Sequence, residues 1–135
     1  MNKDHMARPT VLVIEDNVLN AKLAEAVLTD AGYRVLVATT GEQALPMFQA
    51  CRPDVVLMDI QLPGMDGLTS LQYFRTDPQS RATKIIAVTA MTMKGDRERL
   101  LAVGFDGYIA KPYLQQHLLD AVSTALGTAP KRGPA

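Results

Sequence analysis

Hydrophobic and polar positions along the chain alternate five times between a short apolar run and a longer amphipathic segment. The apolar runs predict β-strands over Thr10 to Ile14, Arg34 to Ala38, Val55 to Met58, Lys84 to Val88 and Tyr108 to Ala110. Three of these runs are almost continuously apolar, which is typical of parallel strands covered on both faces. Right-handed crossovers then place helices above and below the sheet. The pattern predicts a three-layer α/β domain.

The first helix is expected from about Val18 to Ala31, with Gly32 as its C-terminal cap. The apolar stripe by which this helix is expected to pack consists of Leu19, Leu23, Ala26 and Val27. A second helix is predicted to open on a capping box of Thr40 and Gln43. Pro46 lies inside it, and because an internal proline costs roughly 3 kcal/mol, a kink or a delayed start is expected.

Apolar spacing predicts three further helices. The third is marked by Leu68, Leu71 and Phe74, and the fourth spans Arg97 to Val103 and ends at Gly104. The apolar face of the fifth consists of Leu114, Leu118, Val122 and Leu126, with Leu119 and Ala125 beside them.

Composition narrows the class of protein. The 135 residues fit one domain, predicted over 9–127, between a disordered leader or cloning remnant at 1–8 and a flexible tail at 128–135. Fourteen basic residues balance fourteen acidic ones, which argues against nucleic-acid binding, and no apolar run is long enough to span a membrane. The single cysteine, Cys51, excludes an internal disulfide, so a cytoplasmic setting is expected.

Polar side chains stand at the carboxyl ends of four predicted strands. They are Glu15 and Asp16 after the first, Asp59 after the third, Thr89 after the fourth and Lys111 after the fifth. Each alone is explained by a structural role, as a helix cap, a loop cap or a turn residue. Together they lie on the edge of a parallel sheet where ligands bind. Their conjunction predicts a functional site.

The predicted site has three carboxylates, which would repel one another unless a cation lies between them. Oxygen ligands favour a hard ion such as Mg²⁺, which joins carboxylates to phosphate oxygens. Neither His5 nor His117 has a metal-ligand spacing, so zinc is not expected. Lys111 offers a positive charge and Thr89 a hydroxyl donor, which favours a site for a phosphoryl group.

Four motifs resemble the receiver domain of two-component response regulators, and the single-domain, DivK-like type most of all. They are V-I-E-D-N at 13–17, L-M-D-I-Q-L-P-G-M-D-G at 57–67, V-T-A at 88–90 and Y-I-A-K-P at 108–112. The resemblance covers about Thr10 to Leu126. It implies a flavodoxin-like fold of five strand and helix units, with the parallel strands in the order 2-1-3-4-5.

The resemblance also implies a set of ligands and an acceptor. Asp59 would accept the phosphoryl group and bind Mg²⁺, with Mn²⁺ as a substitute, together with Asp16 and the main-chain carbonyl of Gln61. Glu15, which stands where many members have aspartate, would reach the ion through water. The side chains of Gln61 and Met91 would modulate access of water.

Further roles rest on the same resemblance. Lys111 and Thr89 would hold phosphoryl oxygens, and inward movement of Thr89 would let Tyr108 rotate, which is the conformational switch. The Lys111–Pro112 bond is expected to be cis, in a tight turn that aims the lysine. The chain would then be a signalling domain with only its own phosphorylation and dephosphorylation chemistry, not an enzyme.

The implied partners are a histidine kinase or histidine phosphotransferase as donor and a downstream target protein. The first helix would dock the kinase. The fourth helix, fifth strand and fifth helix would form the contact surface, with a dimer through them as an open question.

Three alternatives stay open at this point. A haloacid dehalogenase-type phosphatase also forms an aspartyl phosphate, but Gln61 stands where its acid is needed. A flavin mononucleotide binder shares the topology, but Glu15 and Asp16 would repel its phosphate. A receiver cut from a hybrid kinase or a larger regulator fits the same residues.

Overall fold

The computed structural model describes residues 8–60, 67–90 and 95–127 of the chain. Its five strands form one sheet in the order β2-β1-β3-β4-β5, and every neighbouring pair is parallel. The strands are β1 Thr10–Ile14, β2 Arg34–Ala38, β3 Val55–Asp59, β4 Lys84–Thr89 and β5 Gly107–Ala110. The predicted strands and their order are confirmed, and the last three are each one residue longer than predicted.

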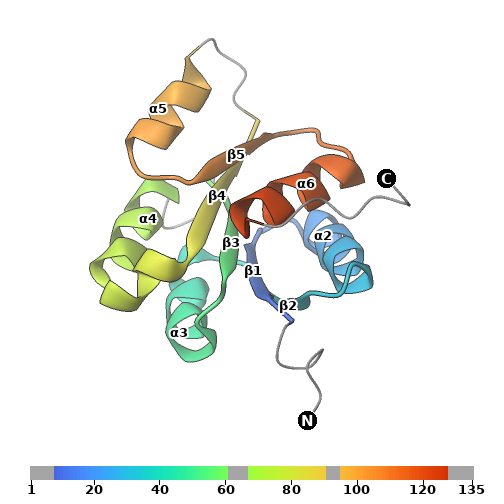
Figure 1. The fold of residues 1–135 in the computed structure, drawn as a ribbon, viewed down its shortest axis with the longest axis horizontal. Coiled ribbons are helices and arrows are strands. Elements are labelled where there is room, and N and C mark those ends of the chain that lie inside the picture. Colours follow the sequence, from blue (N-terminus) through green and yellow to red (C-terminus); the bar gives the residue numbers. More distant parts are fainter. Residues whose placement is uncertain (1–7, 61–66, 91–94, 128–135) are drawn as a thin grey trace.

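Helices lie on both faces of this sheet (Figure 1). The helices are α2 Val18–Asp30, α3 Gly41–Cys51, α4 Gly67–Thr76, α5 Asp96–Ala102 and α6 Gln115–Ala125, with a 3₁₀ turn η1 at Pro78–Ala82. Helices α2 and α6 pack on one face, and α3, α4 and α5 contribute to the apolar cluster on the other. The three-layer α/β architecture is therefore confirmed. Across the described residues, no helix combines the length and apolar character that a membrane span needs.

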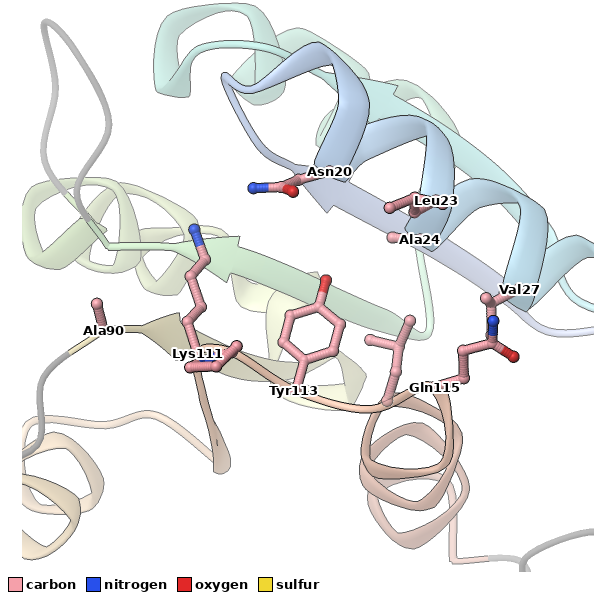
Figure 2. Close-up of a pocket in the computed structure, with 10 residues that line it drawn as sticks. Asn20, Leu23, Ala24, Val27, Ala90, Lys111, Tyr113 and Gln115 are labelled. Carbon is pink, nitrogen blue, oxygen red and sulfur yellow. The ribbon is translucent and has the colours of Figure 1, made fainter.

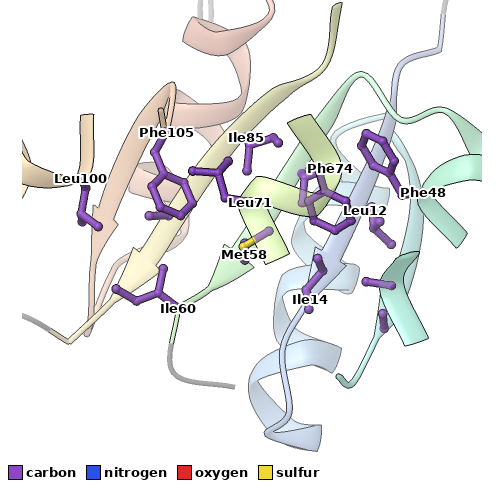
Figure 3. Packing of buried hydrophobic residues seen from close by; sticks show 14 residues of the cluster. Leu12, Ile14, Phe48, Met58, Ile60, Leu71, Phe74, Ile85, Leu100 and Phe105 are labelled. Carbon is purple, nitrogen blue, oxygen red and sulfur yellow. The ribbon is translucent and has the colours of Figure 1, made fainter. Parts of the chain in front are cut away.

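Two apolar clusters hold the layers together because alternate strand residues point to opposite faces. In β1, Leu12 and Ile14 belong to the cluster under α3 and α4, whereas Val11 and Val13 belong to the cluster under α2 and α6. The first cluster includes Phe48 and Phe74, whose stacked ring centroids lie 4.6 Å apart (Figure 3). Both faces of the sheet are thus buried, as the continuous apolar runs predicted.

The predicted packing stripe of α2 is wrong. Leu19 and Leu23 are 65% and 55% exposed, Ala26 is also exposed, and Val27 is only partly buried. The buried residues of α2 are Ala21, Ala24 and Leu28. Both stripes have apolar spacing, and small alanine side chains let the helix backbone approach the sheet more closely than leucines do. The two leucines consequently form an exposed apolar surface on α2.

The start of α3 also differs from the prediction. Thr40 caps the helix as expected, with its hydroxyl accepting from Gln43 N at 3.0 Å, but the Gln43 side chain accepts from Thr39 N instead of returning to Thr40. The helix begins at Gly41 and runs through Pro46, so the delayed start is wrong. Pro46 is the sixth residue of this eleven-residue helix, so α3 forms without the hydrogen bond that an N–H at this position would donate to Glu42 O. The predicted kink stays a prediction.

The predicted bounds of the last two helices differ slightly from those in the structure. Helix α5 begins one residue before the predicted start, and Gly104 follows it with φ +122°, a conformation that favours glycine. Leu114 is the N-cap of α6 and is 69% exposed, so it is not part of the buried face. Leu118 and Val122 are buried there as predicted.

Candidate functional site

The sheet itself brings the predicted residues to one edge. β1 pairs with β3 up to Ile14 opposite Met58, so Glu15 and Asp59 follow on neighbouring strands. Thr89 ends β4 opposite Ala110, and Lys111 follows directly. This adjacency requires the order 2-1-3-4-5, because the carboxyl ends of β1 and β3 meet only when these strands pair.

An acidic cluster forms where β1 and β3 end. Glu15, Asp16 and Asp59 each offer one carboxylate oxygen, and these three oxygens lie within 4.8 Å of one another. Glu15 and Asp59 are each only 5% exposed, whereas Asp16 is exposed. Because buried charges are costly without partners, the cluster requires a nearby cation. The prediction that these acids converge is confirmed.

Lys111 supplies positive charge to this cluster. Its Nζ lies 2.8 Å from Asp59 Oδ2 and 3.3 Å from Glu15 Oε1. Its main-chain N–H donates to Thr89 O at 2.7 Å, which links β5 to the end of β4. The Lys111–Pro112 bond is cis, as expected. The lysine therefore places a positive charge beside two of the three clustered carboxylates.

The electrostatics of the site fit a hard divalent cation. Burial raises the pKa of Glu15, although the Asn17 N–H donates to its carboxylate and works the other way. Burial alone would lower the pKa of Lys111, but its hydrogen bond to Asp59 and the two acidic charges outweigh this and raise the pKa. The ammonium is thus held charged beside carboxylates that favour a cation. The oxygen donor set of Glu15, Asp16 and Asp59 matches the preference of Mg²⁺.

The proposed switch residues lie on adjacent strands. Thr89 is buried at the end of β4, and Tyr108 is half-buried on β5 opposite Ala87. Tyr108 packs against the apolar cluster that contains Met58 and Ile60, the two residues on either side of Asp59 in the sequence. Their positions are compatible with coupling, and the switch role stays a prediction.

Several predicted residues lie outside the described part of the chain. These are Gln61, Met91 and His5, together with the tail 128–135 and all of the leader 1–8 except Arg8. The ligand role of the Gln61 carbonyl and the modulating roles of Gln61 and Met91 stay predictions. His117 lies at the start of α6, where its Nδ1 accepts from Leu114 N at 3.2 Å, so it acts in capping.

Tyr113 is a residue of this site that the motifs did not single out. Its half-buried ring lies beside a groove of about 460 Å³ between α2 and α6, which Lys111 also lines (Figure 2). Tyr113 also lines a small cavity beside Glu15 and Asp59. Its place two residues after Lys111, across the cis Lys111–Pro112 bond, gives no periodic signal that points to this site.

Known proteins are similar to this chain in sequence and in fold. Residues 11–123 match the response regulator receiver domain family. The chain is 38% identical to the polar-differentiation response regulator DivK of Brucella anthropi over 120 residues, which cover 89% of this chain and 98% of the relative. DivK of Brucella ovis matches with the same identity and coverage.

Solved structures of response regulator receivers have the same fold as this chain. The chemotaxis response regulator CheY4 of Vibrio cholerae superposes with a TM-score of 0.83 at 29% identity, covering 88% of this chain and 99% of that one. The receiver domain of the sensor histidine kinase PA1611 of Pseudomonas aeruginosa superposes with a TM-score of 0.81 at 36% identity, covering 90% and 100%. That receiver holds a magnesium ion coordinated in its active-site cleft.

Proposed function

Because the chain belongs to the response regulator receiver domain family, we propose that it accepts a phosphoryl group on Asp59 from a partner's phosphohistidine, with Mg²⁺. The observation that carries this assignment is the contact of Lys111 Nζ with Asp59 at 2.8 Å inside the Glu15, Asp16 and Asp59 cluster. The carboxylate is the nucleophile that phosphoryl transfer needs. The fixed positive charge beside it offsets negative charge on the phosphoryl oxygens.

The transfer step follows from these groups. An oxygen of the Asp59 carboxylate forms a bond to phosphorus while the P–N bond of the donor phosphohistidine breaks, and its electron pair returns to the imidazole nitrogen. No general base is needed because the carboxylate carries no proton. Lys111 donates to a phosphoryl oxygen, and Thr89 is assigned as a second donor.

The metal ligands are assigned by family analogy. Asp16, Asp59 and the Gln61 carbonyl would bind Mg²⁺ directly and Glu15 through water. Bound there, Mg²⁺ would offset the negative charge of the phosphoryl oxygens. The support from this chain is the acidic oxygen cluster and the attraction it exerts on the Lys111 ammonium.

A conformational readout is proposed for the phosphorylated state. The acyl phosphate adds negative charge and acceptor oxygens, which draw the Thr89 hydroxyl toward the phosphoryl group. Movement of Thr89 opens space that Tyr108 enters by rotation. The proposal is supported by the position of Tyr108 at the edge of the apolar cluster on the adjacent strand.

A small phosphodonor tests the assignment directly. Incubation with acetyl phosphate and Mg²⁺ is expected to add about 80 Da, close to one phosphoryl group per chain. The adduct is expected to form with Mn²⁺ as well and to be absent when the metal is chelated. Mass spectrometry measures it. Sustained turnover of a phosphate ester would instead support the phosphatase alternative, and a yellow protein with flavin absorbance would support the flavin alternative.

The donor is proposed to dock on the N-terminal half of α2. Val18, Leu19 and Leu23 are more than half exposed there, and Leu23 borders the groove that leads to Lys111. Contiguous exposed apolar side chains are typical of protein interfaces. A histidine donor bound there would lie close to the acidic cluster.

Substitutions on this surface of α2 are expected to slow phosphorylation by a protein donor but not by a small-molecule donor. The double substitution Leu19→Ser and Leu23→Ser should slow transfer from a phosphorylated histidine phosphotransferase by about tenfold or more, since interface anchors each contribute over 1 kcal/mol. Phosphorylation by acetyl phosphate should be unchanged. Val103→Ser, an exposed apolar residue beyond α5, is the matched control. Equal slowing with both donors would contradict docking on α2.

The downstream partner is proposed to bind the face formed by α5, β5 and α6. A hollow of about 480 Å³ lies there, and its charged lining residues are Lys84, Arg97, Asp106 and Asp120. Tyr108 also lines it, which would connect the switch to the partner surface. The cytoplasmic setting, the stand-alone organisation and dimerisation through this face stay predictions.

A further inference from the structure

Two unequal spaces adjoin Tyr113. One is the groove of about 460 Å³ between α2 and α6, and the other is a cavity of about 10 Å³ beside Glu15 and Asp59. The smaller cavity has room for about one water molecule at most. The residues that line both spaces are Asn20, Ala24, Tyr113 and Leu118. These four side chains therefore form the wall between the groove and the small cavity beside Glu15 and Asp59.

Tyr113 is the largest side chain of this wall and the one next to Lys111. Figure 2 shows both side chains extending from the segment after β5 toward α2. Burial raises the pKa of the Tyr113 phenol, the negative charges of Glu15 and Asp59 raise it further, and Lys111 works the other way. The phenol end of the ring is therefore within electrostatic reach of all three ionic groups.

Lys111 needs such a wall because its side chain is long and flexible. It lines the open groove as well as contacting Asp59 and Glu15, so an alternative path into solvent adjoins its stem. The two ion pairs hold the ammonium at Asp59 and Glu15. The Tyr113 ring lines the same groove as Lys111 and occupies space that alternative rotamers of the lysine would otherwise enter.

We propose that Tyr113 is a positioning residue, whose ring closes the groove side of the site and confines the Lys111 ammonium to Asp59 and Glu15. The inference rests on the proposed function, in which this ammonium receives a phosphoryl oxygen. The aromatic ring carries the effect and the hydroxyl is secondary, since shape and not a hydrogen bond restricts the lysine.

Three variants test the ring. Tyr113→Phe keeps it, Tyr113→Leu keeps an apolar side chain without it, and Tyr113→Ala opens the wall. Tyr33→Ala is the matched control, because Tyr33 is a second half-buried tyrosine packed against the same apolar cluster, in the connection before β2. Thermal unfolding of all variants identifies those that fold.

The first readout is the limiting rate of adduct formation with acetyl phosphate at saturating Mg²⁺. Tyr113→Leu and Tyr113→Ala are expected to lower it by about tenfold or more, since a misplacement of about 1 Å can cost roughly 100-fold in rate. Tyr113→Phe and Tyr33→Ala are expected to stay within about twofold of wild type, a difference typical of sites outside the chemistry. Loss of rate in Tyr113→Phe equal to that in Tyr113→Ala would overturn the role of the ring.

The second readout follows Lys111 without any phosphorylation. Reductive methylation read by peptide mass is expected to modify Lys111 slowly in wild type and several-fold faster in Tyr113→Leu, while exposed Lys84 reacts equally in both. Unchanged protection of Lys111 in a folded Tyr113→Leu variant would overturn the inference. Absence of any wild-type adduct would instead refute the proposed function, and the methylation result would still decide the role of Tyr113.

Discussion

Asp59→Asn is expected to abolish the phosphoryl adduct that the wild-type chain forms with acetyl phosphate and Mg²⁺. An amide oxygen is a far weaker nucleophile than a carboxylate, and the substitution also removes one of the three clustered acidic charges. The shape of the side chain is nearly unchanged, so Lys111 retains its contact with Glu15. Intact-protein mass spectrometry measures the loss, which should exceed about 100-fold in rate, as for removal of a covalent nucleophile.

The control for this substitution is Asp120→Asn on α6, which removes a carboxylate bound to Gln116 away from the acidic cluster. It should be phosphorylated at the wild-type rate. Thermal unfolding should show that both variants fold. An adduct of undiminished rate on Asp59→Asn, mapped by peptide mass to another side chain, would refute Asp59 as the acceptor.

The second large effect concerns the metal. Asp16→Asn is expected to weaken Mg²⁺ binding by at least roughly 10- to 100-fold, since even outer-shell changes at metal sites cost that much. Wild-type protein in Mg²⁺ at a hundred times its Kd gains about 2.7 kcal/mol of stability toward unfolding, and a 100-fold weaker variant would lose most of this gain. Thermal unfolding across a Mg²⁺ titration measures both the Mg²⁺ affinity and the gain in stability. Labelling of Asp16→Asn by acetyl phosphate should slow in parallel.

The direction in which Asp16→Asn changes stability in the absence of Mg²⁺ distinguishes a metal ligand from a residue with a structural role. In chelator, Asp16→Asn should leave stability unchanged or raise it, because it relieves repulsion among Glu15, Asp16 and Asp59. Glu15→Gln is the matched comparison and should weaken Mg²⁺ binding less, because its contact is assigned through water. An Asp16→Asn variant stabilised by Mg²⁺ as strongly as wild type would contradict the metal assignment.

Sequence patterns were not sufficient to predict which side of helix α2 packs on the sheet. The stripe of Leu19 and Leu23 and the stripe of Ala21, Ala24 and Leu28 both have helical spacing, and hydropathy favours the leucines. The fold buries the second stripe because alanines permit a closer approach to the sheet. Only the position of the sheet decides between two stripes on the same helix.

Sequence alone determined the elements and the chemistry at their ends. Apolar runs such as Val55 to Met58 define buried parallel strands, and Asp59 directly after that run is conspicuous because a charge ending a buried segment needs a partner. The acids, the lysine and the cis Lys111–Pro112 bond were all inferred from local motifs and resemblance. The strands and the polar residues at their ends depend on residues close together in the chain. The cis bond was expected from the resemblance.

Tertiary structure alone decided which groups meet and what encloses them. The 2.8 Å contact between Lys111 and Asp59 joins residues 52 positions apart, and it exists because β3, β4 and β5 pair in register. The wall that Tyr113 forms with Asn20 of α2 and Leu118 of α6 likewise joins two segments that are far apart in the chain. Distances and enclosure come from long-range packing, which periodicity within one segment does not encode.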